Sequence, residues 1–284
     1  MTGVLKKLFG DLSTFSHYAP GVETSMDLDD LGPSGYMAER RVKSLISIDV
    51  FNSITADMEE YEPLRSAMAN LTLNRQLVFD AVSRRKNGVD VYKYELEAMQ
   101  RSYQENYFNA MDALIQLVAN DAALKSSWQK TRYYLLLSSC QITSAEEFDM
   151  IYPIDLSYLF FFRIVPLQKE CLDERLAIYF AKTTDTHIVS MIKLALAKKT
   201  VAKALRRFDI LEFPPTIKNL FEDNTATRSG KDESDRASAL ADQLDSEADN
   251  IITNVDSLMN TDSSSDDSSY SSLNEPDDKI IMFP

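Results

Sequence analysis

Apolar residues recur at three- and four-residue steps along most of the chain, a spacing that places side chains on one face of an α-helix. The pattern predicts a long helix over Tyr61–Lys86, with Pro63 in its first turn, and a second over Tyr92–Ala119. Gly88 lies between them, where a left-handed cap would end the first helix. Two long helices joined by so short a connection lie antiparallel. The sequence therefore predicts an all-α fold, a helical bundle around a long αα-hairpin.

The first part of the chain has a different composition. Five of the seven glycines fall within the first 35 residues, so we expect residues 1–33 to form an extended arm with only a short helix at Val4–Phe9. Ser34 is then expected to cap a helix from Gly35 to about Ile46. From there to residue 222 the helical signal continues, and we assign residues 34–222 to a helical body.

Two further signals divide the helical body. Ser144 and Glu147 have the spacing of a capping box and predict the start of a short helix. A more apolar helix is expected from Asp155 or Ser157 onwards, and Pro166 lies inside it, where a proline should kink or break the helix.

The end of the chain combines an amphipathic helix with a polar linker. Residues 223–260 show a narrow apolar stripe with acidic residues opposite, as in a helix that docks on another surface or pairs in a coiled coil. Residues 261–284 form an acidic Ser/Asp-rich tail that ends in an apolar peptide, which is either a docking peptide or a frayed terminus. We predict that this arm is mobile in the free monomer and orders on a neighbouring subunit or another protein. The predicted partner interface consists of Leu240, Leu244, Ile251, Ile252, Val255, Leu258, Ile280, Ile281, Met282 and Phe283.

Composition excludes several classes of protein. A chain with seven glycines in 284 residues is too poor in glycine for the many tight turns of a β-sandwich or barrel. It also has no glycine-rich loop of the kinds that cradle nucleotide phosphates. The two histidines and two cysteines show no metal-ligand spacing, so we expect no zinc site, no other metal site and no cofactor, and we interpret the thiols as core residues in a reducing compartment.

Charge is distributed unevenly. Residues 221–284 hold 16 acidic and 4 basic residues, a net charge of −12, whereas the remaining 220 residues carry 28 and 26, a net charge of −2. Neither part has the basic excess of a nucleic-acid-binding surface. No signal peptide and no apolar run of about 20 residues is visible, which indicates a soluble protein made in the cytosol, with no membrane partner.

Catalytic chemistry would have to rely on carboxylates, because histidine is scarce. The adjacent acids Glu146 and Glu147, and the similar groups at residues 59–62 and 95–97, are interpreted as solvated helix faces. The tyrosines Tyr92, Tyr103 and Tyr107 follow one helix face and are interpreted as core rather than as a base-stacking platform. We therefore predict a protein without enzymatic activity.

Five segments carry a resemblance to a known family. They read LRSAMANL at Leu64–Leu71, VYKYELE at Val91–Glu97, NAMDALI at Asn109–Ile115, EEFDMIYPI at Glu146–Ile154 and YLFFF at Tyr158–Phe162. In order and residue type, over residues 30–180, the chain resembles an all-helical structural protein of Bacteroidetes phages, crAss-like phages included. Such proteins are associated with the neck, the head-to-tail connector below the portal.

The resemblance implies a virion structural protein. It would be a homo-oligomeric ring of twelve copies in the neck, in contact with the portal protein and with other neck and tail ring proteins, and DNA would pass through the ring without specific binding. An acidic surface near the DNA would repel the phosphate backbone. The alternative is a free helical adaptor or regulator that recruits a partner through its acidic tail. A third class, a metal-dependent hydrolase, would contain bound metal detectable by elemental analysis.

Overall fold

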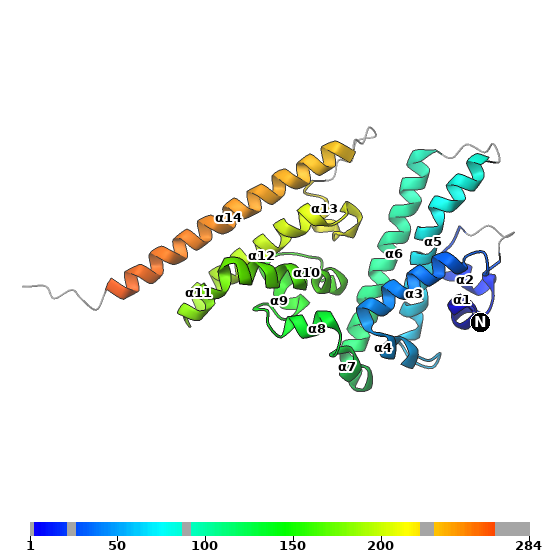
Figure 1. The fold of residues 1–284 in the computed structure, drawn as a ribbon, viewed down its shortest axis with the longest axis horizontal. Coiled ribbons are helices and arrows are strands. Elements are labelled where there is room, and N and C mark those ends of the chain that lie inside the picture. Colours follow the sequence, from blue (N-terminus) through cyan, green and yellow to red (C-terminus); the bar gives the residue numbers. More distant parts are fainter. Residues whose placement is uncertain (1–2, 22–26, 87–91, 222–229, 265–284) are drawn as a thin grey trace, which may run out of the picture.

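In a computed structural model, the structure describes residues 3–21, 27–86, 92–221 and 230–264. Over these ranges every regular element is a helix, so the all-α prediction is confirmed. The helices form two groups along the long axis of the molecule (Figure 1). Helices α1 to α7 make up the first group, and α8 to α14 make up the second.

The hairpin helices α5 (Tyr61–Lys86) and α6 (Lys93–Asn120) lie side by side and antiparallel in the first group (Figure 1). The first has the predicted bounds, and the second begins one residue later than expected, because Tyr92 precedes it as an exposed N-cap residue. Met68 and Leu114 are fully buried, as expected for side chains on the apolar faces of these helices. Gly88, the predicted cap, lies outside the described residues.

The predicted helix Val4–Phe9 is confirmed, but the rest of the described N-terminal segment is not the extended arm that was predicted. Residues 3–21 form α1 (Val4–Phe9) and α2 (Leu12–Tyr18), and Leu5, Phe9 and Phe15 are buried. Gly10, at a φ of 75°, ends α1 in a backbone conformation that favours glycine, and α2 follows directly. The glycines therefore separate short helices instead of keeping the segment extended.

Contacts to α5 hold the N-terminal helices in place. The Arg65 guanidinium lies 5.3 Å from the ring centre of Phe9 and 4.7 Å from that of Tyr18. The Asn70 amide donates a hydrogen bond of 2.9 Å to the Tyr18 carbonyl. The Tyr61 hydroxyl donates one of 3.0 Å to the Leu8 carbonyl. These side chains lie far from residues 3–21 in sequence, which explains why local signals missed the contact.

The remaining helices of the first group cover the hairpin. They are α3 (Gly32–Ile46), α4 (Ile48–Ser53) and α7 (Ala122–Trp128). Ser34 does not cap α3 as predicted, because α3 already begins at Gly32 and its N-cap residue is Leu31. Ser34 is buried within the first turn, and its hydroxyl donates a hydrogen bond of 2.8 Å to the Gln76 side chain of α5.

The second group is built around α10 and α12, which pack against each other. Its elements are α8 (Arg132–Leu137), α9 (Ala145–Ile151), α10 (Tyr158–Cys171), the π-helical turn η1 (Leu172–Leu176), α11 (Ala177–Lys182), α12 (Thr186–Arg207), the 3₁₀ turn η2 (Ile210–Glu212), α13 (Pro215–Lys218) and α14 (Gly230–Ser264). The predicted N-cap is confirmed, since the Glu147 N–H donates a hydrogen bond of 3.1 Å to the Ser144 hydroxyl. The Glu147 carboxylate accepts its backbone hydrogen bond from the Thr143 N–H, and not from the Ser144 N–H as in a capping box. Pro166 does not break α10, which continues to Cys171.

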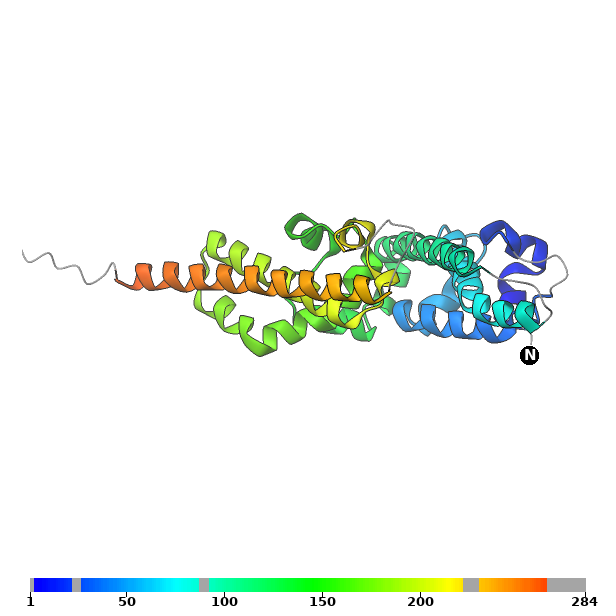
Figure 2. The ribbon, with the colours of Figure 1, turned by 90° about the horizontal axis from the view of Figure 1, so that it is seen from above.

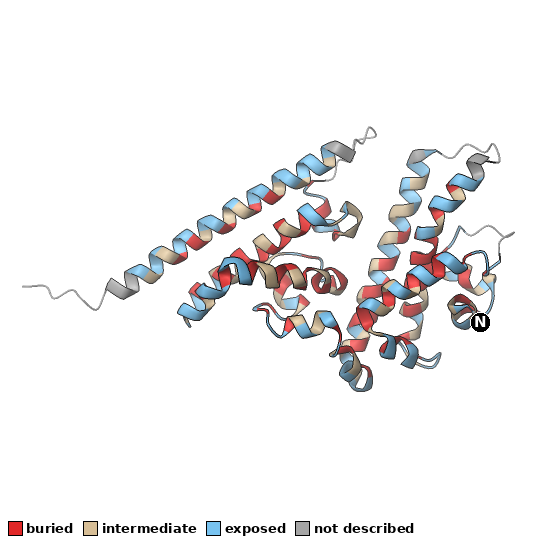
Figure 3. Ribbon diagram, viewed as in Figure 1, coloured by how far each residue is buried: buried red, intermediate tan, exposed pale blue. Residues whose placement is uncertain are grey.

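The two groups share one hydrophobic core. Buried side chains from α1 through α14 form a single connected cluster, and α10 touches α6 across the junction between the groups. Figure 3 shows the buried residues concentrated where the helices meet, whereas the free end of the hairpin is mostly exposed. The junction between the groups therefore lies between buried surfaces, and the hairpin end projects away from them.

Candidate functional site

The predicted interface on α14 faces α12 of the same chain. Both views show α14 lying along α12 (Figures 1 and 2). Leu244, Ile252 and Val255 are buried, whereas Leu240 and Ile251 are half-buried. Of the predicted helix residues only Leu258 is exposed, at 41%. The stripe therefore has its partner within the chain, and the prediction that it docks on a neighbouring protein is wrong. Residues 280–283, the other part of the predicted interface, lie outside the described residues.

Ion pairs run along this α12–α14 contact, which we call the α12–α14 seam. Lys199 lies 3.5 Å from a carboxylate oxygen of Asp245 and 3.1 Å from one of Asp249. Arg206 pairs with Asp242 at 2.7 Å and with Asp245 at 2.6 Å. The acidic face of α14 therefore meets the basic residues that follow one side of α12. Sequence reasoning identified the acidic face of α14 but did not pair it with α12.

The carboxylates considered as catalytic candidates have structural partners. The Tyr158 hydroxyl donates a hydrogen bond of 2.6 Å to Glu146, and Glu147 forms an ion pair with Lys193. Tyr103 and Tyr107 are buried as predicted for core residues, but Tyr92 is 59% exposed. Among the residues that the structure describes, no three His, Cys, Asp or Glu side chains lie close enough together to hold a metal ion.

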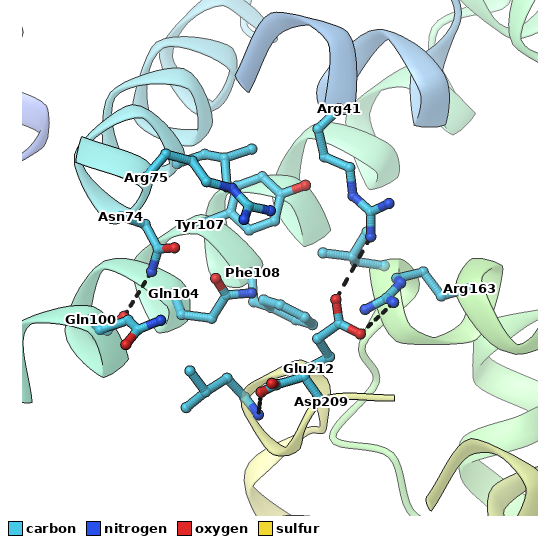
Figure 4. A pocket seen from close by; sticks show the side chains of 13 residues that line it. Arg41, Asn74, Arg75, Gln100, Gln104, Tyr107, Phe108, Arg163, Asp209 and Glu212 are labelled. Carbon is cyan, nitrogen blue, oxygen red and sulfur yellow. Dashed lines mark hydrogen bonds and ion pairs between the residues drawn. The ribbon is translucent and has the colours of Figure 1, made fainter. Parts of the chain in front are cut away.

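The pocket with the most unusual chemistry lies at the junction of the two helix groups (Figure 4). It has a volume of about 170 Å³, and helices α3, α5 and α6 supply one side, α10 and the η2 region the other. Most of its side chains are polar: Arg41, Asn74, Arg75, Gln100, Gln104, Tyr107, Arg163, Asp209 and Glu212. Leu71, Phe108, Leu159 and Leu211 complete the lining.

Three arginines approach this pocket from three different helices. Arg163 forms a 2.5 Å ion pair with Glu212, and Arg41 lies 3.8 Å from the other oxygen of the same carboxylate. The Arg163 guanidinium also lies over the Phe208 ring, 4.5 Å from its centre. Arg75 is exposed and makes no ion pair or hydrogen bond with any described residue. The Glu212 carboxylate thus pairs with both Arg41 and Arg163, whereas Arg75 has no paired carboxylate among the described residues.

The Tyr107 hydroxyl lies at the wall of this pocket and has no acceptor for its proton among the described residues, since the nearby Arg41 guanidinium can only donate. Its side chain is 3% exposed. Burial raises the pKa of Tyr107 to about 12, although the nearby Arg41 and Arg163 guanidinium groups act in the opposite direction. The hydroxyl is therefore a neutral hydrogen-bond donor at physiological pH. A buried polar group without a partner costs free energy, about 1–3 kcal/mol, unless something binds to it.

The remaining polar groups of the pocket are partly engaged. The Asn74 amide donates a hydrogen bond of 3.0 Å to the Gln100 carbonyl across the hairpin. The Asp209 carboxylate accepts one of 2.9 Å from the Leu211 N–H and so caps η2. The pocket therefore offers more donors than acceptors, which suits binding of an anion. Sequence reasoning missed it because its arginines are separated by dozens of residues and belong to no motif.

A second feature is apolar and lies at the free end of the hairpin. Six large side chains are exposed there: Val78, Phe79, Val82, Tyr92, Tyr94 and Met99, which we call the hairpin-end surface. The Tyr92 and Tyr94 rings stack with their centres 5.8 Å apart. These residues lie toward the free end of α5 and the beginning of α6, and exposed aromatic and Met side chains are enriched at protein-binding surfaces.

Comparisons with protein-family models, with curated proteins and with solved structures found no match to this chain. Within the described ranges, no helix combines the length and the apolar character needed to cross a membrane.

Proposed function

We propose that this chain is a structural subunit without enzymatic activity that assembles with copies of itself into a ring in a phage neck. In this proposal the ring has twelve copies, contacts the portal protein and other neck and tail ring proteins, and lets DNA pass without specific binding. The identity of the particle rests on the sequence resemblance. The self-assembly rests on one structural observation, the hairpin-end surface.

The position of the hairpin-end surface supports contact with a second copy of the chain. The hairpin projects to one side of the long axis, beyond the helices that cover its lower part (Figure 1). Phe79 is 58% and Tyr94 is 67% exposed. A projecting apolar surface suits subunits that stand side by side. The hairpin end of one subunit would contact a different surface of the neighbouring subunit. Such head-to-tail contacts close into a ring when the rotation between neighbours permits it.

The intramolecular partners of α14 weigh against an adaptor that binds through this helix, whereas an adaptor that binds through the acidic tail would rely on residues 265–284, which lie outside the described residues. An adaptor that recruits its partner through the amphipathic helix would need the apolar stripe exposed, but Ile252 and Val255 have no exposed surface. Release of α14 would also break the ion pairs of Lys199 and Arg206. The hairpin-end surface needs no such rearrangement to bind.

The test measures assembly with and without the hairpin-end surface. Light scattering after size exclusion and electron microscopy should reveal rings of the wild-type chain, alone or after addition of the portal protein of the same phage. The double variant Phe79→Ser/Tyr94→Ser should stay monomeric with an unchanged circular dichroism spectrum. The control Met150→Ser changes a side chain that is 82% exposed on α9 and should assemble normally. Ring formation by the double variant, or a wild-type monomer that binds a single partner, would contradict the proposal.

A further inference from the structure

We propose that the pocket at the junction of the two helix groups is a binding site for a phosphate group. Its walls carry Arg41, Arg75 and Arg163, and the buried hydroxyl of Tyr107 lies among them (Figure 4). This inference does not depend on the proposed assembly, because it concerns the single folded chain.

The charge balance of the pocket favours an anion. Three guanidinium groups face two carboxylates, and one of these, Asp209, already accepts a hydrogen bond from the Leu211 N–H. Glu212 alone compensates Arg41 and Arg163, at 3.8 and 2.5 Å. An anion beside Arg75 would supply the missing negative charge.

The donors also match the shape of a phosphate group. Guanidinium groups donate to oxyanions through two parallel N–H groups, and here they come from α3, α5 and α10. The Gln104 side-chain amide and the Tyr107 hydroxyl add donors from α6. A planar carboxylate presents only two oxygens, whereas a tetrahedral phosphate presents acceptor oxygens in several directions at once. The volume of about 170 Å³ accommodates such a group.

A bound phosphate would give the Tyr107 hydroxyl the partner that it lacks. The hydroxyl is buried and meets no acceptor among the described residues. Because α3, α5 and α6 line one side and α10 and η2 the other, the same ligand would also connect the two helix groups. A ligand that binds only the folded state stabilises it, so the melting temperature should rise with phosphate concentration.

The experiment is a calorimetric titration of the purified full chain at pH 7.5 and constant ionic strength, with inorganic phosphate and, separately, with a nucleoside 5′-monophosphate. We expect saturable binding of one phosphate group per chain. Arg75→Gln should weaken the affinity at least about tenfold, the usual effect of losing one hydrogen bond to a charged group. Tyr107→Phe should also weaken it. Arg75 is exposed and unpaired among the described residues, so its replacement leaves the fold intact.

The matched control is Arg40→Gln, which removes the same charge from α3 at an exposed position that does not line the pocket. Its affinity should equal that of the wild type. Binding of both probes supports a site for the phosphate group that they share, binding of the nucleotide alone identifies a phosphate ester as the ligand, and binding of inorganic phosphate alone identifies free phosphate. The absence of saturable binding would overturn the proposal, and so would equal weakening by Arg75→Gln and Arg40→Gln, which would indicate attraction to the overall charge alone.

Discussion

The Asp112 carboxylate on α6 accepts a hydrogen bond of 2.7 Å from the backbone N–H of Leu159 in the first turn of α10. The Ser157 hydroxyl, which caps α10, donates to the same oxygen at 3.2 Å. One acidic side chain of the first helix group thus completes the N-terminus of the central helix of the second. Desolvation by burial outweighs these hydrogen bonds and raises the pKa of Asp112 to about 6.

This raised pKa predicts a pH dependence of stability. An acid whose pKa is higher in the folded than in the unfolded state, where it is about 3.9, holds its proton more tightly when folded. Its contribution to the free energy of unfolding therefore falls as the pH rises from about 4 to about 6, by about 3 kcal/mol at most. Asp112→Asn keeps an acceptor oxygen but cannot ionise. The difference in unfolding free energy, wild type minus variant, should decrease across this window in urea titrations.

The control for Asp112 is Asp57→Asn, since Asp57 is a carboxylate whose pKa is lowered, chiefly by a hydrogen bond from Thr55. Because its pKa is lower in the folded state, Asp57 contributes stability as the pH rises. The difference in unfolding free energy between the wild type and Asp57→Asn should therefore not decrease between pH 4 and 6. Parallel curves for the wild type and Asp112→Asn would show that Asp112 ionises normally in the folded state.

The hairpin core predicts a large effect of a single truncation. Leu114 is fully buried on α6, so Leu114→Ala removes contacts and leaves a cavity, which costs about 2–5 kcal/mol. Val78→Ala on α5 is the control, because Val78 is 59% exposed and its truncation should change the free energy of unfolding by less than about 0.5 kcal/mol. Equal shifts of the urea midpoint would mean that the two faces of the hairpin are assigned incorrectly.

Local sequence signals predicted the ends of a helix correctly where those ends depend on residues within or next to the helix. Pro63 and the apolar repeat after it predicted Tyr61–Lys86, and Ser144 with Glu147 predicted the start of α9. At Pro166, where a kink or a break was predicted, the helix is not broken, since α10 continues for five further residues past the proline.

Partners distant in sequence could not be predicted. The stripe of α14 was identified correctly as a docking face, but nothing in its sequence showed that Lys199 and Arg206 of α12 would face its acids. The phosphate pocket was missed for the same reason, since Arg41, Arg75 and Arg163 converge only in the folded chain. Periodicity reports that a face is buried, and not which surface buries it.

The two thiols should be unreactive in the folded protein. Burial raises the pKa of both Cys140 and Cys171 to about 11, so only about one thiol in a thousand is ionised at pH 8. Ellman's reagent should react with them slowly in buffer and rapidly in urea. Rapid reaction of one thiol in the folded state would mean that the structure around it opens locally, and the two single Cys→Ser variants would identify which one.

The apolar segment at residues 280–283 lies outside the described residues and stays a prediction as a docking peptide. The buried side chains of the α12–α14 seam run from Ala241 to Val255. Deleting residues 262–284 should therefore leave the melting temperature of the free chain unchanged and weaken its incorporation into particles. Quantitative mass spectrometry of purified particles measures the incorporation, and an unchanged copy number would contradict a docking role.

The packing of the α12–α14 seam predicts that a single charge introduced between the two helices will detach α14 from α12. Ile252 has no exposed surface, so Ile252→Asp places a carboxylate between α14 and α12, where burial without a partner costs several kcal/mol. Seam ion pairs are partly exposed and contribute about 0–1 kcal/mol each, too little to offset this cost. The α14 amides should lose protection from hydrogen exchange while those of α5 and α6 keep theirs. Leu258→Asp makes the same change at a position 41% exposed on the same helix and should leave α14 protected. Full protection of α14 in Ile252→Asp would mean that the apolar stripe does not hold the helix in place.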